Sequence, residues 1–278
     1  MSVKIVTDSD GDFPPRLVKD LGITVIPQYV IFGSTSYRSG VEITDDEFYR
    51  RLLNGPVFPT TSQPTLKDFV DVYTDLAKET DGIISIHVSS KLSGTVNVAE
   101  QANKISKLNC PIEIIDCQNI SISMGLIVIA AARMANAGKG LSDIADAAKS
   151  IVSRTKFLML FGTLEYLAKG GRIGKAKSLL GSMLNVKPIL TLKDGEMAPV
   201  TQVHSRSKGL EKLLDFVKNA KDIEEVGICY TTLRDEAEDL ASRVSAITSA
   251  NVLITRVGPV LGAHSGPGAI GIALLTKN

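Results

Sequence analysis

The sequence predicts an α/β protein built from two α/β domains, the first with a mainly parallel sheet flanked by helices and the second with a mixed sheet. In the first half, short β-branched runs alternate with segments whose apolar residues recur at helical spacing, an alternation typical of parallel sheets. In the second half, Asp194-Gly195 separates two apolar runs, which is a strong hairpin signal. With 278 residues, 44% of them hydrophobic, the chain is long enough to bury the core that this fold needs.

The expected strands of the first half are β-branched runs bounded by Asp, Gly or Pro. They cover residues 4–7, 24–31, 83–88 and 112–115. The expected helices cover residues 44–53, 64–79 and 95–108. The first of these helices opens with a capping box, Thr44 and Glu47. Residues 121–137 are a long apolar stretch interrupted by Arg133; because a membrane span needs roughly 20 apolar residues, we interpret the stretch as a buried helix.

The second half is expected to contain six strands and two helices. The strands cover residues 157–161, 186–192, 197–203, 226–230, 252–256 and 270–275, and the helices cover residues 205–220 and 233–249. No repeat or low-complexity linker separates the halves. We place the domain boundary near residue 155, which gives an N-terminal domain over 1–155 and a C-terminal domain over 156–278.

Composition argues against several classes of protein. The 31 basic residues nearly balance the 30 acidic ones, so the chain lacks the positive charge that nucleic acid binding favours. The N-terminal residues show no signal-peptide pattern, and we expect a cytoplasmic protein without stable membrane insertion. The three cysteines and three histidines lack metal-ligand spacing, so we expect no metal and no other cofactor.

Three polar clusters point to one binding pocket. Residues 258–271 hold five glycines and two prolines around His264 and Ser265, a composition that predicts a tight loop able to bind a small group. Two hydroxyl-rich clusters, 60–64 and 89–95, lie where strand-like runs give way to helix-like patterns. We expect all three clusters to meet.

The hydroxyls of the two upstream clusters allow two interpretations. Thr61 and Ser62 are suited to cap the following helix, although one cap does not need three hydroxyls in a row. Ser93, Gly94 and Thr95 are likewise suited either to cap a helix or to offer its free N–H groups to a carboxylate or phosphate.

Two histidines receive different interpretations. His87 lies inside an apolar strand, where a hydrogen-bonded core histidine is expected. His264 lies in a Gly/Pro-rich segment, where its ring is suited to bind a ligand oxygen.

Gly170-Gly171-Arg172 is either a helix C-cap with a solvated arginine or a segment that shapes the site or a partner surface.

Six motifs occur in a fixed order along nearly the whole chain. They are Thr7-Asp8-Ser9, Thr61-Ser62-Gln63-Pro64, Ser89-Ser90-x-Leu92-Ser93-Gly94-Thr95, Leu167-x-x-Gly170-Gly171-Arg172-Ile173, Lys187-Pro188-Ile189 and Gly258-Pro259-Val260-x-Gly262-x-His264-x-Gly266-Pro267-Gly268. In this set and order the sequence resembles the DegV family.

The resemblance implies a protein that binds one long-chain fatty acid and presents its carboxylate to a fatty acid kinase, which converts it to an acyl phosphate. By this resemblance the protein is not itself an enzyme, and Thr61, Ser93 and His264 hold the carboxylate. Family members that serve the kinase often carry Arg-Thr-Arg where this chain reads His204-Ser205-Arg206, so the first arginine is replaced. We expect Lys169, Arg172 and Arg206 to face the kinase or to shape the site, and the acyl tail to enter an apolar cavity that includes residues 124–131.

Two other functions stay open at this point. An acyl hydrolase would use Ser93 as nucleophile and His264 as base, with Asp8 or Asp116 orienting the imidazole. A carrier of a small polar carbonyl compound, as in dihydroxyacetone kinase subunits, would use a histidine to bind the ketone and would have a small hydrophilic pocket.

Overall fold

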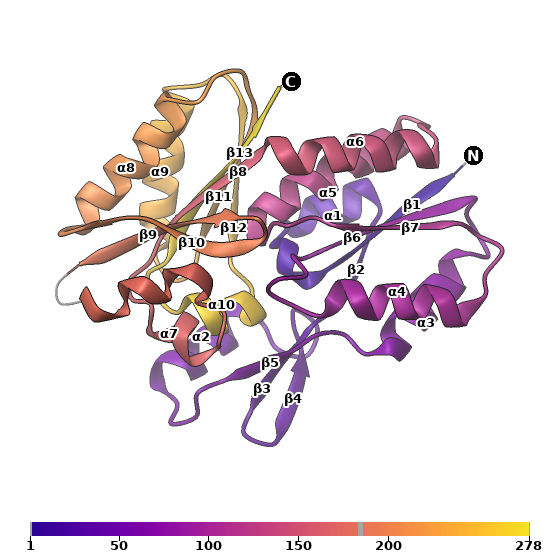
Figure 1. The fold of residues 1–278 in the computed structure, drawn as a ribbon, viewed down its shortest axis with the longest axis horizontal. Coiled ribbons are helices and arrows are strands. Elements are labelled where there is room, and N and C mark those ends of the chain that lie inside the picture. The colour runs from indigo at the N-terminus through magenta and orange to yellow at the C-terminus, as the bar shows by residue number, and fades with distance from the viewer. Residues whose placement is uncertain (1, 183–185, 278) are drawn as a thin grey trace.

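The computed structural model describes residues 2–182 and 186–277, which form three sheets and the helices that cover them (Figure 1). The first sheet has the strand order β2-β1-β6-β7 and all its neighbours are parallel. Its strands are β1 (Val3–Asp8), β2 (Ile23–Ile26), β6 (Gly82–His87) and β7 (Ile112–Asp116). This confirms the predicted parallel sheet.

Helices cover both faces of this sheet, as parallel sheets require. They are α1 (Pro15–Leu21), α3 (Leu66–Leu76), α4 (Thr95–Ser106), α5 (Ser121–Asn136) and α6 (Leu141–Arg154). Helices α3 and α4 pack on one face, where Phe69 and Tyr73 are fully buried. Helices α5 and α6 pack on the other face.

The second sheet is mixed, also as predicted, with the order β10-β9-β8-β13-β11-β12. Its strands are β8 (Thr155–Leu160), β9 (Lys187–Lys193), β10 (Glu196–Val203), β11 (Ile223–Tyr230), β12 (Asn251–Arg256) and β13 (Ile270–Thr276). The β9–β10 pair is the predicted hairpin across Asp194-Gly195, and β11–β12 is the parallel pair. Helices α8 (Arg206–Lys218) and α9 (Arg234–Ser245) pack on this sheet.

Helix α5 joins the two sheets into one hydrophobic core. It contacts β1 of the first sheet and β8, β11 and β13 of the second, which explains why its sequence is apolar on every side. The expected buried helix over 121–137 is thereby confirmed, because residues 121–129 are all buried. The division into domains at residue 155 stays a prediction, although the strands of the second sheet all begin at or after this residue.

A third, small sheet supports the remaining elements near the polar clusters. It has the order β4-β3-β5, with β3 (Tyr29–Phe32), β4 (Thr35–Arg38) and β5 (Thr60–Ser62). Helices α2 (Asp45–Asn54) and α10 (Pro259–Ser265) pack beside it, and Val30, Phe48 and Ala263 share a small core there. The short helix α7 (Glu165–Lys169) and the 3₁₀ segment Gly174–Ser182 complete the described chain.

Two sequence predictions about local structure are wrong. The single strand expected over 24–31 is divided between two sheets, since β2 ends at Ile26 and β3 begins at Tyr29. Pro27 lies at the break, and proline cannot donate a ladder hydrogen bond. The tight loop expected around His264 is the helix α10, which starts with Pro259 at its first position and ends before Gly266 at φ 67°.

Candidate functional site

A cavity of about 260 Å³ lies between the first and second sheets. The loops that follow β1, β6 and β7 reach it from one side, which places it at the carboxyl ends of parallel strands, where α/β proteins commonly bind ligands. Its polar lining residues are Asp10, Gln28, Thr61, Ser62, Gln63, Ser93, Ser121, Arg172, His264 and Ser265. Its apolar lining includes Leu92, Phe157, Met159, Phe161, Leu167, Met197 and Leu261.

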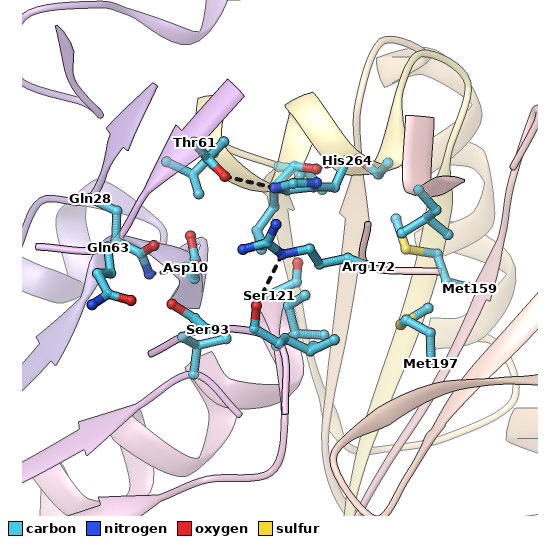
Figure 2. Close-up of a pocket in the computed structure, with 18 of the residues that line it drawn as sticks. Asp10, Gln28, Thr61, Gln63, Ser93, Ser121, Met159, Arg172, Met197 and His264 are labelled. Carbon is cyan, nitrogen blue, oxygen red and sulfur yellow. Dashed lines mark hydrogen bonds between the residues drawn. The ribbon is translucent and has the colours of Figure 1, made fainter. Parts of the chain in front are cut away.

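The cavity is polar on one side and apolar on the other (Figure 2). Thr61, Ser93 and Asp10 lie at one side of the view, Met159 and Met197 lie at the other, and Arg172 lies between them. The expected contribution of residues 124–131 is wrong. Those residues belong to α5, where all but Ala130 are buried, and they do not line the cavity, because α5 packs against both sheets.

Thr61 and His264 meet at the polar side, although 203 positions separate them. The Thr61 Oγ1 and His264 Nε2 atoms lie 2.8 Å apart, as Figure 2 shows by a dashed line. Thr61 is on β5 and His264 is in the last turn of α10; α10 packs against β5, and this packing brings the two side chains together.

The imidazole of His264 is uncharged at neutral pH. Burial, and secondarily the positive charge of Arg172, lower the pKa of His264 from 6.5 to about 4. Its Nδ1 atom is buried, has no hydrogen-bond partner among the described residues and lies against Gly170, where an added Cβ atom would be 2.1 Å from it. Because Thr61 occupies the one bonding site of Nε2, the pair presents the Thr61 hydroxyl to the cavity.

Ser93 stands at the start of α4, where its hydroxyl is not used as a helix cap. The N-cap of α4 is Gly94, which makes no side-chain cap bond, and the Ser93 Oγ atom lies 2.8 Å from Thr95 Oγ1. Likewise the cap of α3 is Thr65, in a capping box with Asp68. The capping interpretation of Thr61, Ser62 and Ser93 is therefore wrong, and the hydroxyls of Thr61 and Ser93 line the cavity instead.

The other predicted site residues divide into two groups. Ser62 and Ser265 line the cavity, but their hydroxyls donate to the carbonyls of Gln63 and Leu261. Gly94 and Thr95 follow Ser93 in the sequence but, unlike Ser93, do not line the cavity.

The three predicted cations differ in their surroundings. Arg172 is exposed, lines the cavity, and donates from Nε to the carbonyl of Leu92 at 3.2 Å. Lys169 is exposed and pairs with Glu165 at 2.6 Å. Arg206 forms an ion pair with Glu236 and donates to the carbonyl of Gly268 at 2.7 Å. The Arg206 charge is thus already matched within the protein.

The structure adds four polar residues that the sequence interpretation did not single out as ligand-binding, namely Asp10, Gln28, Gln63 and Ser121. Asp10 and Gln28 are buried, and Gln28 Nε2 donates to Asp10 Oδ2 at 2.7 Å. Burial, reinforced by the charges of Asp8 and Asp12, raises the pKa of Asp10 well above its usual value. The acidic residues Asp8, Asp10 and Asp12 at the end of the first strand were the sequence feature that could have indicated a polar site there.

His87 is a core histidine, as expected. It is fully buried, with Nδ1 2.9 Å from Asp8 Oδ2 and Nε2 2.7 Å from Ser85 Oγ. Asp8 is therefore bound to His87, and Asp116 accepts from Ser90. Because His264 pairs with Thr61 and Ser93 with Thr95, the described residues do not form the triad that the hydrolase alternative needs.

Asp12 lies beside the cavity and should make stability depend on pH. Its Oδ1 accepts from the backbone N–H of Gly258 at 2.8 Å and its Oδ2 from Ser121 at 2.5 Å, yet burial raises its pKa to about 7. The folded state then binds more protons than the unfolded state between pH 4 and 7, so stability falls as pH rises through that window.

Asp12→Asn should therefore stabilise the protein more at pH 8 than at pH 4, by up to about 4 kcal/mol. Asparagine tolerates the left-handed backbone that Asp12 adopts at φ 44°. Urea unfolding of both proteins at the two pH values measures the difference. An equal effect of the substitution at pH 4 and pH 8 would contradict this account.

Within residues 2–182 and 186–277, two kinds of feature are absent. No group of three or more His, Cys, Asp or Glu side chains in these ranges is placed to hold a metal ion. No helix in the same ranges is long and apolar enough to cross a membrane.

Comparison with known proteins places the chain in a family. A family model described as "Uncharacterised protein, DegV family" matches residues 2–277. A DegV domain-containing protein of Caldanaerobacter subterraneus is 36% identical over an alignment 278 positions long, which covers 97% of each chain.

Solved structures agree with this assignment. A fatty acid binding DegV family protein from Thermus thermophilus is 33% identical, with a TM-score of 0.92 and full coverage of both chains. A stearic acid-binding protein from Eubacterium ventriosum is 27% identical, with a TM-score of 0.92 over 99% of this chain and 98% of that one. From its sequence and its fold alike, the chain belongs to the DegV family.

Proposed function

We propose that the protein binds a long-chain fatty acid in the cavity between its sheets and, in the cytoplasm, presents the carboxylate to a fatty acid kinase for acyl phosphate formation. The protein itself acts as a binding subunit and not as an enzyme. In this proposal the domains 1–155 and 156–278 both contribute, since Thr61 and Ser93 come from the first and His264 from the second. The fatty acid binding relatives from Thermus thermophilus and Eubacterium ventriosum support the ligand class.

The observation that carries the proposal is one cavity with a polar and an apolar side. Burying each methylene is favourable by about 0.8 kcal/mol, so the tail supplies most of the affinity. The carboxylate loses water on entry and needs donors in return. The hydroxyls of Thr61 and Ser93 line the polar side for this purpose. A small polar ketone would not cover the apolar side chains of Phe157, Met159 and Met197, which also line the cavity.

Native mass spectrometry of freshly purified protein, followed by lipid extraction, tests the ligand class. We expect one fatty acid per chain. Recovery of polar metabolites alone would contradict the proposal and favour the carbonyl carrier.

Removing a head-group hydroxyl should weaken ligand binding without unfolding the protein. We expect Ser93→Ala and Thr61→Val each to weaken fatty acid affinity by about 5- to 150-fold, because a lost buried hydrogen bond costs about 1–3 kcal/mol. Fluorescent fatty acid displacement measures the affinity. Ser90→Ala is the matched control, because Ser90 bonds to Asp116 and does not line the cavity. Unchanged affinity in both site variants would place the head group elsewhere.

Presentation to the kinase requires a cationic surface that is separate from the ligand contacts. Lys169 is exposed and does not line the cavity, so Lys169→Glu should slow acyl phosphate formation severalfold at unchanged lipid affinity. Lys139→Glu, an equally exposed change elsewhere, is the control. If both variants support the same kinase rate, Lys169 is not part of the docking surface.

A further inference from the structure

The carboxyl of Asp10 has one oxygen that no residue binds. Asp10 is only 3% exposed and lines the cavity. Its Oδ2 accepts a hydrogen bond from Gln28, whereas its buried Oδ1 has no partner among the described residues. Figure 2 shows Asp10 between Thr61, Gln28 and Ser93, at the polar side of the cavity. Because an unpaired buried polar atom is costly, Oδ1 is suited to meet a ligand atom.

Gln28 determines which oxygen of Asp10 carries a proton. The Gln28 Nε2 atom donates to Asp8 Oδ1 at 3.0 Å and to Asp10 Oδ2 at 2.7 Å, which uses both of its hydrogens. Asp10 Oδ2 must therefore be an acceptor. A proton on Asp10 then lies on Oδ1, the oxygen without a partner.

The charged groups around Asp10 favour its neutral form. Asp8, at the end of β1, and Asp12 both lie close enough to oppose a second negative charge, and burial adds to this effect. Arg172, from the segment after α7, is the opposing cation and acts more weakly. On α10 the ring of His264 is uncharged, and His87 on β6 is paired with Asp8.

We propose that Asp10 is a ligand-binding residue that donates a hydrogen bond from a protonated Oδ1 to the carboxylate of the bound acid, so that two carboxyl groups share one proton. This inference rests on the proposed function and specifies the head group as a carboxylate that arrives as a monoanion. Two neighbouring carboxylates cannot both stay ionised. Where free Asp10 is ionised, the shared proton is taken from solvent on binding, and no covalent bond changes.

The proposal makes ligand affinity depend on pH in a specific way. Once pH exceeds the value at which free Asp10 ionises, the affinity should fall by tenfold for each pH unit, because one proton is taken up with the ligand. Asp10→Asn keeps an acceptor for Gln28 and places a permanent donor at the position of Oδ1. Its affinity should equal that of the original protein where free Asp10 is protonated and exceed it at pH values where free Asp10 is ionised.

Isothermal titration calorimetry with decanoate, which is ionised throughout pH 6–10, tests this in two buffers of different ionisation enthalpy. We expect the original protein to take up one proton per decanoate at high pH and Asp10→Asn to take up none. Asp71→Asn is the control, since Asp71 lies in an exposed pair with Lys67 and does not line the cavity, and it should retain the uptake. The number of protons that the unaltered protein takes up per decanoate tests the proposal even if a variant folds poorly.

Two results would overturn the role of Asp10. One is decanoate binding by the unaltered protein with neither proton uptake nor loss of affinity from pH 6 to 10. The other is a folded Asp10→Asn protein that binds more than tenfold more weakly at pH 6. Failure of the unaltered protein to bind decanoate or stearate at any pH would overturn the fatty acid proposal itself, and this inference with it.

Discussion

Replacing Gly170 with alanine is expected to weaken fatty acid binding by tenfold or more in a protein that stays folded. A Cβ atom at this position would lie 2.1 Å from Nδ1 of His264 and 2.7 Å from its Cε1. The backbone of Gly170, at φ −78° and ψ −6°, suits alanine, so the substitution acts through the ring. His264 must turn away, and its hydrogen bond to Thr61 is lost.

The loss of affinity follows from the head-group geometry. Turning the ring removes one donor or acceptor from the polar side of the cavity and leaves the Thr61 hydroxyl without its partner at 2.8 Å. One lost buried hydrogen bond costs about 1–3 kcal/mol, and about 1.4 kcal/mol corresponds to tenfold in Kd. Displacement titrations with a fluorescent fatty acid measure the change.

Gly140→Ala is the matched control for this substitution. Gly140 also has a negative φ, −74°, and the nearest atom to an added Cβ is 3.7 Å away. The control should bind like the original protein. If Gly170→Ala binds equally well, with His264 shown by NMR to have moved, then the imidazole does not contribute to ligand binding.

The general architecture could be predicted from the sequence because each part of it depends on local patterns. The alternation of strand and helix patterns gave the parallel sheet, and Asp194-Gly195 gave the hairpin between β9 and β10. The polar side of the cavity was also anticipated in part. Thr61, Ser93 and His264 do line one cavity. Ser93 follows β6 at the carboxyl edge of the parallel sheet, whereas Thr61 and His264 reach the cavity through the packing of α10 against β5.

The features that could not be predicted depend on which elements pack together. The role of Asp10 requires Gln28, a residue beyond the intervening helix α1, to reach it inside the protein. The exclusion of residues 124–131 from the cavity follows from the position of α5 between two sheets. The α10 helix was missed for a different reason: its glycines suggested a loop, whereas Gly262 is needed so that Phe48 and Tyr49 can pack closely against the helix.

Removing the ring of Phe157 should destabilise the protein and change which acyl lengths it prefers. Phe157 is 3% exposed, and it lines both the cavity of about 260 Å³ and a second one of about 290 Å³. On the scale set by a cavity of about 150 Å³ that holds one benzene, the first cavity takes about ten carbons and the two together about twenty. We therefore expect an acyl chain longer than about ten carbons to displace the Phe157 ring.

For the original protein, the gain in affinity per added methylene should fall below about 0.8 kcal/mol once the chain exceeds about ten carbons. In Phe157→Ala the gain should continue toward about twenty carbons, while unfolding becomes easier by about 3–5 kcal/mol. Titration with saturated acids of 8 to 20 carbons, together with urea unfolding, measures both effects.

Phe161→Ala separates loss of a core ring from the opening of a passage. Phe161 is 1% exposed and lines only the first of the two cavities. Its removal should cost similar stability without extending the preferred chain length, because Phe161 does not separate the two cavities. Should both variants shift the length preference alike, the tail does not run past Phe157. The polar rim of the second cavity, which includes Gln118, Asn119 and Lys149, would then mark a boundary that the apolar chain does not cross.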